Sequence, residues 1–220
     1  MSATAAMSAG ARVAGLVLAL GYLTGFVPGP LVAPVGGLAL VTFGRCLDLD
    51  RSSQVLSAAS LAVVAGAVGV TGLRWGTLDL AGLRSVQAVL GPTLLVGPMA
   101  GALASIAAAG AAIVALALWL SARPVQGAWQ GAWAALETVG MSLCVVTAFW
   151  GPKVLAGADV ELSETMRDAG VWLGALSVCV VIGVAGALAL RALAGRGAMG
   201  LMSACALVVI AAAAVAGSVA

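Results

Sequence analysis

The side chain with the clearest chemical potential is Glu137, because it is the only acidic residue inside a predicted membrane-spanning segment. A charged group in hydrocarbon is costly, so such residues usually face a polar path or bind a partner. Gln130 lies two helical turns earlier, which places both side chains on one face of a helix. Glu137 and Gln130 are therefore the candidates for a path that carries protons or ions.

A structural role is the alternative for Glu137. Its predicted position is within about two turns of one end of its span, where it would reach the membrane surface or pair with an arginine such as Arg123. No second ionisable group is predicted inside a span, whereas proton relays chain several such groups. The sequence leaves both roles open.

Two long apolar stretches contain prolines, which remove a backbone donor and disfavour a continuous helix. The helix-breaking candidates are Pro28, Pro30, Pro92 and Pro98. Transporters use interrupted helices to expose backbone carbonyls to a substrate. The alternative is that these prolines only mark turns and kinks near the ends of spans.

Small residues recur at four-residue spacing in one of these stretches, at Gly97, Gly101, Ser105 and Ala109. Such a face lets helix backbones approach closely in lipid, where packing drives association. It predicts either a compact bundle or an interface with partner subunits. Chance is the alternative, because the chain has 30 glycines.

Several chemistries are excluded by the residues that the chain lacks. It has no histidine, and its four cysteines are dispersed without a C-x-x-C pair, which argues against metal sites and nucleophile–histidine pairs. It has no phosphate-binding loop motif. A net charge of +2 is too small for a nucleic-acid binder. We therefore expect no enzyme activity, no cofactor, no metal and no nucleic-acid partner.

The composition predicts the fold class. Of 220 residues, 63% are hydrophobic and 8% are charged, and the mean hydropathy is +1.17. At roughly 20 residues a span, this suffices for about seven transmembrane helices. The prediction is an all-α, polytopic membrane bundle in a single domain over residues 1–220, with six spans if 31–46 is re-entrant. The spans are expected at about 12–28, 31–46, 54–73, 93–120, 130–150, 171–190 and 199–219, with an interfacial helix at 75–85.

Seven spans divide the basic residues six to four between the two sides of the membrane. The side with six holds Arg12, Arg45, Arg51, Arg123, Arg191 and Arg196. The positive-inside rule then predicts a cytoplasmic N-terminus and an outside C-terminus, in the plasma membrane.

Two functional classes remain. The first is a non-catalytic transmembrane subunit or scaffold that packs against the lipid bilayer and other membrane subunits. The second is a small proton- or ion-coupled transporter that uses Glu137 and the interrupted helices. The first is favoured, because few polar residues are predicted at membrane depth.

Overall fold

The computed structural model describes residues 3–23, 29–90, 97–122, 130–149, 162–192 and 197–219. Within these ranges the chain is helical apart from short connections and one isolated bridge between Pro30 and Asp79. The helices are α1 (Ala3–Leu23), α2 (Ala33–Cys46), α3 (Arg51–Trp75), α4 (Leu80–Leu90), α5 (Met99–Ser121), α6 (Gln130–Phe149), α7 (Leu162–Ala192) and α8 (Ala198–Val219).

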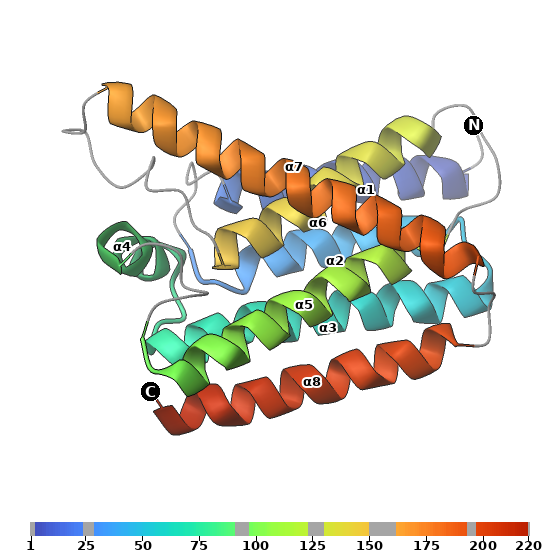
Figure 1. Cartoon of the computed structure of the whole chain (residues 1–220). Helices are drawn as coiled ribbons and strands as arrows, with labels where there is room; N and C mark the ends of the chain where they lie inside the picture. Colours follow the sequence, from blue (N-terminus) through green and yellow to red (C-terminus); the bar gives the residue numbers. More distant parts are fainter. Residues whose placement is uncertain are drawn as a thin grey trace.

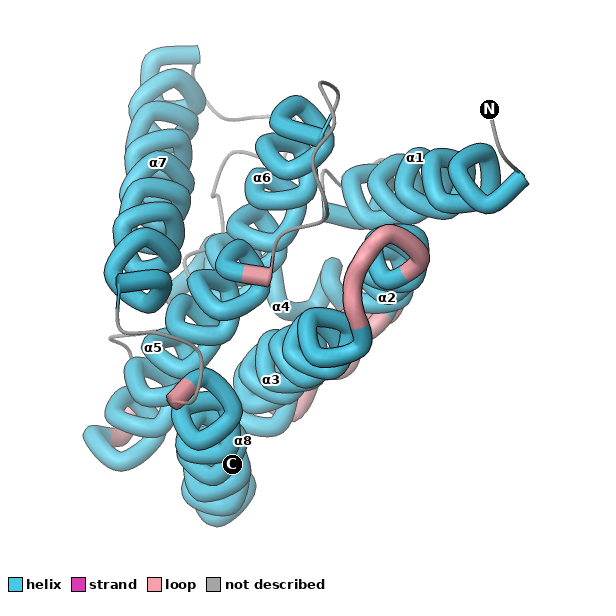
Figure 2. Tube along the Cα trace, turned by 90° about the vertical axis from the view of Figure 1, so that its right-hand side faces the viewer, coloured by secondary structure: helices cyan, strands magenta, loops and turns pink. Residues whose placement is uncertain are grey.

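All helices except α4 run between the two ends of the bundle and alternate in direction, with α7 inclined to the helices that it crosses, and α4 lies at one end of the bundle (Figure 1). We call this end the α4 end, and the opposite end, with the loop 47–50, the Asp48 end. Figure 2 shows α1 and α2 on the right and α7 on the left, with α6 between them and with α5, α3 and α8 on the lower side. Because α5 contacts α3, α6, α7 and α8, it forms the centre of the bundle.

The structure bears out the predicted all-α membrane bundle. Among the described residues, five helices are long and apolar enough to cross a membrane: α1, α3, α5, α8 and the part of α6 from Ala132 to Phe149. Two shorter apolar helical segments, α2 and residues Leu176–Ala189 of α7, accompany them. The predicted interfacial helix 75–85 overlaps α4 only over residues 80–85, because α3 extends to Trp75 and α4 begins at Leu80.

The first helix differs from the prediction, because α1 begins at Ala3 and not near residue 12. The residues before Arg12 are mostly alanine and other small residues that are compatible with a helix. Arg12 therefore lies inside α1, where it is buried, and does not mark the end of a span.

The α1–α2 hairpin is held by close backbone contact between glycine-lined faces. A Cβ atom on Gly37 would lie 2.6 Å from the backbone N of Ala19 and 2.7 Å from the carbonyl O of Gly15. A Cβ on Gly15 would likewise lie 2.5 Å from the carbonyl O of Gly37. The absence of side chains at both glycines therefore sets how closely the two helices approach.

At the Asp48 end, Asp50 caps the N-terminus of α3, and its carboxylate accepts hydrogen bonds from the backbone N–H groups of Ser52 and Ser53. These two serines hold the pKa of the exposed Asp50 carboxyl down to about 2. At the other end of α3, Gly76 adopts φ +60°, the left-handed conformation that ends helices.

At the α4 end, polar side chains of α4 cap the ends of two other helices. The Arg84 guanidinium donates to the carbonyls of Tyr22 and Leu23 at 3.0 and 2.8 Å. The buried Gln87 amide donates to the carbonyls of Thr147 and Ala148, both at 3.1 Å. The last turns of α1 and α6 thus find partners that a membrane does not offer.

Candidate functional site

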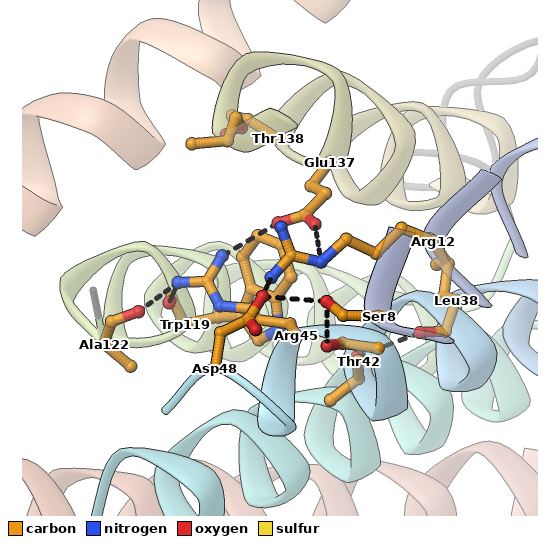
Figure 3. Close-up of polar contacts among 12 residues, drawn as sticks. Ser8, Arg12, Leu38, Thr42, Arg45, Asp48, Trp119, Ala122, Glu137 and Thr138 are labelled. Carbon is orange, nitrogen blue, oxygen red and sulfur yellow. Dashed lines mark hydrogen bonds and ion pairs between the residues drawn. The ribbon is translucent and has the colours of Figure 1, made fainter. Parts of the chain in front are cut away.

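The candidate site is a cluster of four charged side chains near the Asp48 end, drawn in Figure 3. Arg12 comes from α1, Arg45 from the end of α2, Asp48 from the following loop and Glu137 from α6. We call these four residues the charge cluster. The side chains of Arg12, Arg45 and Glu137 are at most 4% exposed, whereas that of Asp48 is 32% exposed.

Glu137 stands between the two arginines. Its Oε2 accepts a hydrogen bond from Nη1 of Arg45 at 3.1 Å, and its Oε1 lies 3.5 Å from Nε of Arg12. Helix α6 therefore has both oxygens of one carboxylate directed at the α1–α2 hairpin. The charge of Glu137 is balanced by side chains that are distant in sequence.

Arg45 also binds the end of α5. Its Nη2 donates to the carbonyl of Trp119 at 2.8 Å and to the carbonyl of Ala122. The guanidinium stacks on the Trp119 ring, 3.9 Å from the ring centroid. Because the C-terminal end of a helix carries partial negative charge, α5 and Glu137 both stabilise the buried cation. Arg45 thus joins α2, α5 and α6.

Arg12 connects Glu137 to the more exposed carboxylate of the cluster. Its Nη2 lies 2.7 Å from Oδ2 of Asp48. The Ser8 hydroxyl, one turn before Arg12 on α1, lies 2.8 Å from the same Asp48 oxygen and 2.8 Å from the carbonyl of Gly44. These contacts fasten α1 to the end of α2.

The charge cluster contains two cations and two anions, so its formal net charge is zero. Buried charges are tolerated when they are paired and hydrogen-bonded, and removing one partner from such a pair typically costs about 3–5 kcal/mol. The arrangement can hold helices in register, and it can also place a carboxylate deep in the bundle within reach of further ionisable groups.

The other predicted site residues lie apart from this cluster. Pro30 and Pro98 each precede a helix and do not interrupt one, since α2 begins at Ala33 and α5 at Met99. Pro28, Pro92 and Arg123 lie outside the described residues, as does the side chain of Gln130.

The small-residue face of α5 packs inside the bundle at the α4 end. Gly101, Ser105 and Ala109 are buried, whereas Gly97 is exposed. The Ser105 hydroxyl accepts a hydrogen bond from Nη1 of Arg74 at 2.6 Å, and Cβ atoms on Gly97 and Gly101 would lie 3.1 and 3.0 Å from the same guanidinium. This face therefore accommodates a buried arginine of α3.

Sequence reasoning identified Glu137 but missed its partners. The expectation that no second ionisable group lies inside a span was wrong, because Arg12 lies within α1. The sequence does carry a signal for these partners. Ser8 and Arg12 are one helical turn apart, and so are Arg45 and Asp48, so each pair places two polar groups on one side of the chain. The charge of Arg12 is also typical of the end of a span, so the sequence alone predicts a helix boundary there.

No protein-family model matches this chain, and no curated protein or solved structure matches it either.

Proposed function

We propose that this chain is a non-catalytic multi-pass membrane protein that serves as a transmembrane subunit or scaffold of a larger membrane complex. One observation carries the proposal: the buried charges of the cluster are bound to one another and to helix ends. Glu137 is held between two guanidinium groups, and Arg45 caps α5. Charges used in this way hold helices together.

The outward faces of α7 and α8 support this role. Large apolar side chains are exposed on both helices, among them Val181 and Leu188 on α7 and Leu207 and Ile210 on α8. These faces suit acyl chains of the bilayer and the apolar helices of neighbouring subunits. The proposed partners are accordingly lipid and other membrane proteins, with no nucleic acid and no cofactor.

We place the chain in the plasma membrane with the Asp48 end in the cytoplasm. Among the described residues, Arg12, Arg45, Arg51 and Arg191 belong to the half of the bundle towards the Asp48 end, whereas Arg74, Arg84 and Arg167 belong to the half towards the α4 end. This small excess of basic residues at the Asp48 end supports a cytoplasmic N-terminus. Labelling of a cysteine introduced at the N-terminus in intact and in opened cells tests the orientation.

The main test is purification of the tagged full-length chain from its native membrane in mild detergent, followed by mass spectrometry. A fixed stoichiometric set of other membrane proteins is the expected result. Recovery of the chain alone, under conditions that keep other membrane complexes of the same cells intact, would contradict a subunit role.

A small proton- or ion-coupled transporter is the second candidate, and a specific observation favours it. Arg12 bridges the partly exposed Asp48 and the buried Glu137, so ionisable groups extend from the surface into the bundle. Liposomes that contain the purified chain are the test. Proton or ion flux that Glu137→Gln abolishes and Thr138→Val preserves would establish this candidate. Absence of flux in the unmodified chain would eliminate it.

A further inference from the structure

The two halves of α6 differ in how they are packed. From Met141 to Phe149 every residue is buried, so this half lies inside the bundle. In the half before it, Ala132, Ala135, Leu136 and Val139 are exposed. Glu137 lies on the side of α6 that faces the α1–α2 hairpin, and it is buried there, as is the neighbouring Thr138.

In the first half of α6, the described polar contacts with other helices all come from one residue. Of the side chains described between 132 and 140, Glu137 alone has a recorded polar contact with another helix. The hydroxyl of its neighbour Thr138 donates to the carbonyl of Ala134 in the same helix. Gly140 adds apolar contact, since a Cβ there would lie 3.3 Å from Leu16 and 3.7 Å from Leu38.

We infer that the first half of α6, residues 130–140, is a movable arm, and that Glu137 is the latch that fastens this arm to the α1–α2 hairpin. The hairpin keeps its own contacts without the latch, because Arg12 binds Asp48 and Ser8 binds Gly44 within it. The second half of α6 stays anchored by its burial and by Gln87 at the α4 end. Movement is therefore confined to the Asp48 end.

Charge explains why the latch depends on Glu137. With its carboxylate, the cluster has two cations and two anions. Without that charge, Arg12 keeps Asp48 and Arg45 keeps the carbonyls at the end of α5, but the cluster has one formal positive charge in excess in a buried position. Uncompensated buried charge is strongly unfavourable, so separation of the arm, which admits water to the guanidinium groups, becomes the favoured response.

The test measures distances between spin labels in the full-length chain in lipid nanodiscs, with the four native cysteines replaced by alanine. One label pair spans the latch, at Val13 of α1 and Leu136 of α6, which are 48% and 53% exposed. A reference pair lies in the rest of the bundle at the same end, at Val55 of α3 and Met199 of α8. The exposed positions keep the labels out of the packed core.

Glu137→Gln is expected to add a longer-distance population to the Val13–Leu136 pair and to leave the reference pair unchanged. Thr138→Val is the matched control, because it alters the adjacent buried side chain without touching the arginines, and it is expected to match the parent chain in both pairs.

An unchanged Val13–Leu136 distribution in Glu137→Gln would overturn the inference. An equal change in both pairs would overturn it as well, because the whole bundle would then have loosened. If Glu137→Gln yields no folded chain, Arg45→Gln is measured in its place. It removes the guanidinium that hydrogen-bonds to Glu137 and leaves the cluster with one negative charge in excess, so a longer-distance population is again expected. A Val13–Leu136 distribution like that of the parent chain would refute the latch.

Discussion

Two adjacent glycines of α2 allow a sharp test of how the α1–α2 hairpin is held. Gly37 faces α1, where a Cβ atom would lie 2.6 Å from the backbone N of Ala19. Gly36 is exposed, and a Cβ atom there would have nothing within 4 Å. Alanine at either position makes the same chemical change in the same helix, so the difference between the two variants reports the contact with α1.

The structure sets the magnitude of that difference. Ordinary contact with a Cβ begins near 3.4 Å, so Gly37→Ala requires the helices to separate by up to about 0.8 Å. A gap of that size removes a quarter to a half of the dispersion energy across the contact, and overpacking typically costs about 1–3 kcal/mol. The gain in helix propensity, about 0.5–1 kcal/mol for alanine over glycine, is common to both variants.

The assay is unfolding of the purified chain by SDS in mixed micelles, followed by circular dichroism. We expect Gly36→Ala to be at least as stable as the parent chain and Gly37→Ala to lie about 1–3 kcal/mol below Gly36→Ala. Gly15→Ala and Gly10→Ala repeat the comparison on α1, since a Cβ on Gly10 has nothing within 4 Å. Equal stability within each pair would refute the claim that glycine contact holds the hairpin.

Three further predictions use the same unfolding assay. Gln87→Leu removes the amide that caps α6 and is expected to cost about 1–3 kcal/mol, whereas the exposed Ser85→Ala should stay within about 0.5 kcal/mol of the parent chain. Ser105→Ala removes the acceptor of a buried Arg74 hydrogen bond, which should cost about 1–3 kcal/mol. The pKa of Asp50 is lowered to about 2 in the folded chain, so its ionised carboxylate contributes fully to the free energy of unfolding above about pH 4, and this contribution is lost as the pH falls towards 2. Asp50→Asn should therefore make the free energy of unfolding less dependent on pH over this interval. The same pH dependence in Asp50→Asn and the parent chain would contradict this role.

The helical elements were largely readable from the sequence, since hydropathy and proline positions locate them. Four predicted segments match a helix to within three residues at each end: 31–46 and α2, 54–73 and α3, 130–150 and α6, and 199–219 and α8. The predicted start lies six residues before that of α5 and nine residues after those of α1 and α7. At α1 the reason is Arg12, because a charged residue is typical of the end of a span. A helix boundary depends on backbone hydrogen bonding, which a buried and paired arginine does not interrupt.

The candidate site was readable only in part. Burying a carboxylate in an apolar segment costs free energy, so such residues are rare and Glu137 could be identified from its position alone. Its partners could not be identified in this way, because Arg12 and Arg45 are distant from Glu137 in the sequence and contact it only when α1, α2 and α6 pack together. Likewise the small-residue face of α5 was visible, but its packing against Arg74 was not.

The sequence by itself determined that this chain is an all-α membrane protein, because apolar content and the scarcity of charge depend on composition alone. The tertiary structure decided which charges are buried together, which of two adjacent glycines touches another helix, and which helix ends α4 caps. These are relations between residues distant in sequence, and only the three-dimensional packing of the helices brings them within hydrogen-bonding or van der Waals distance.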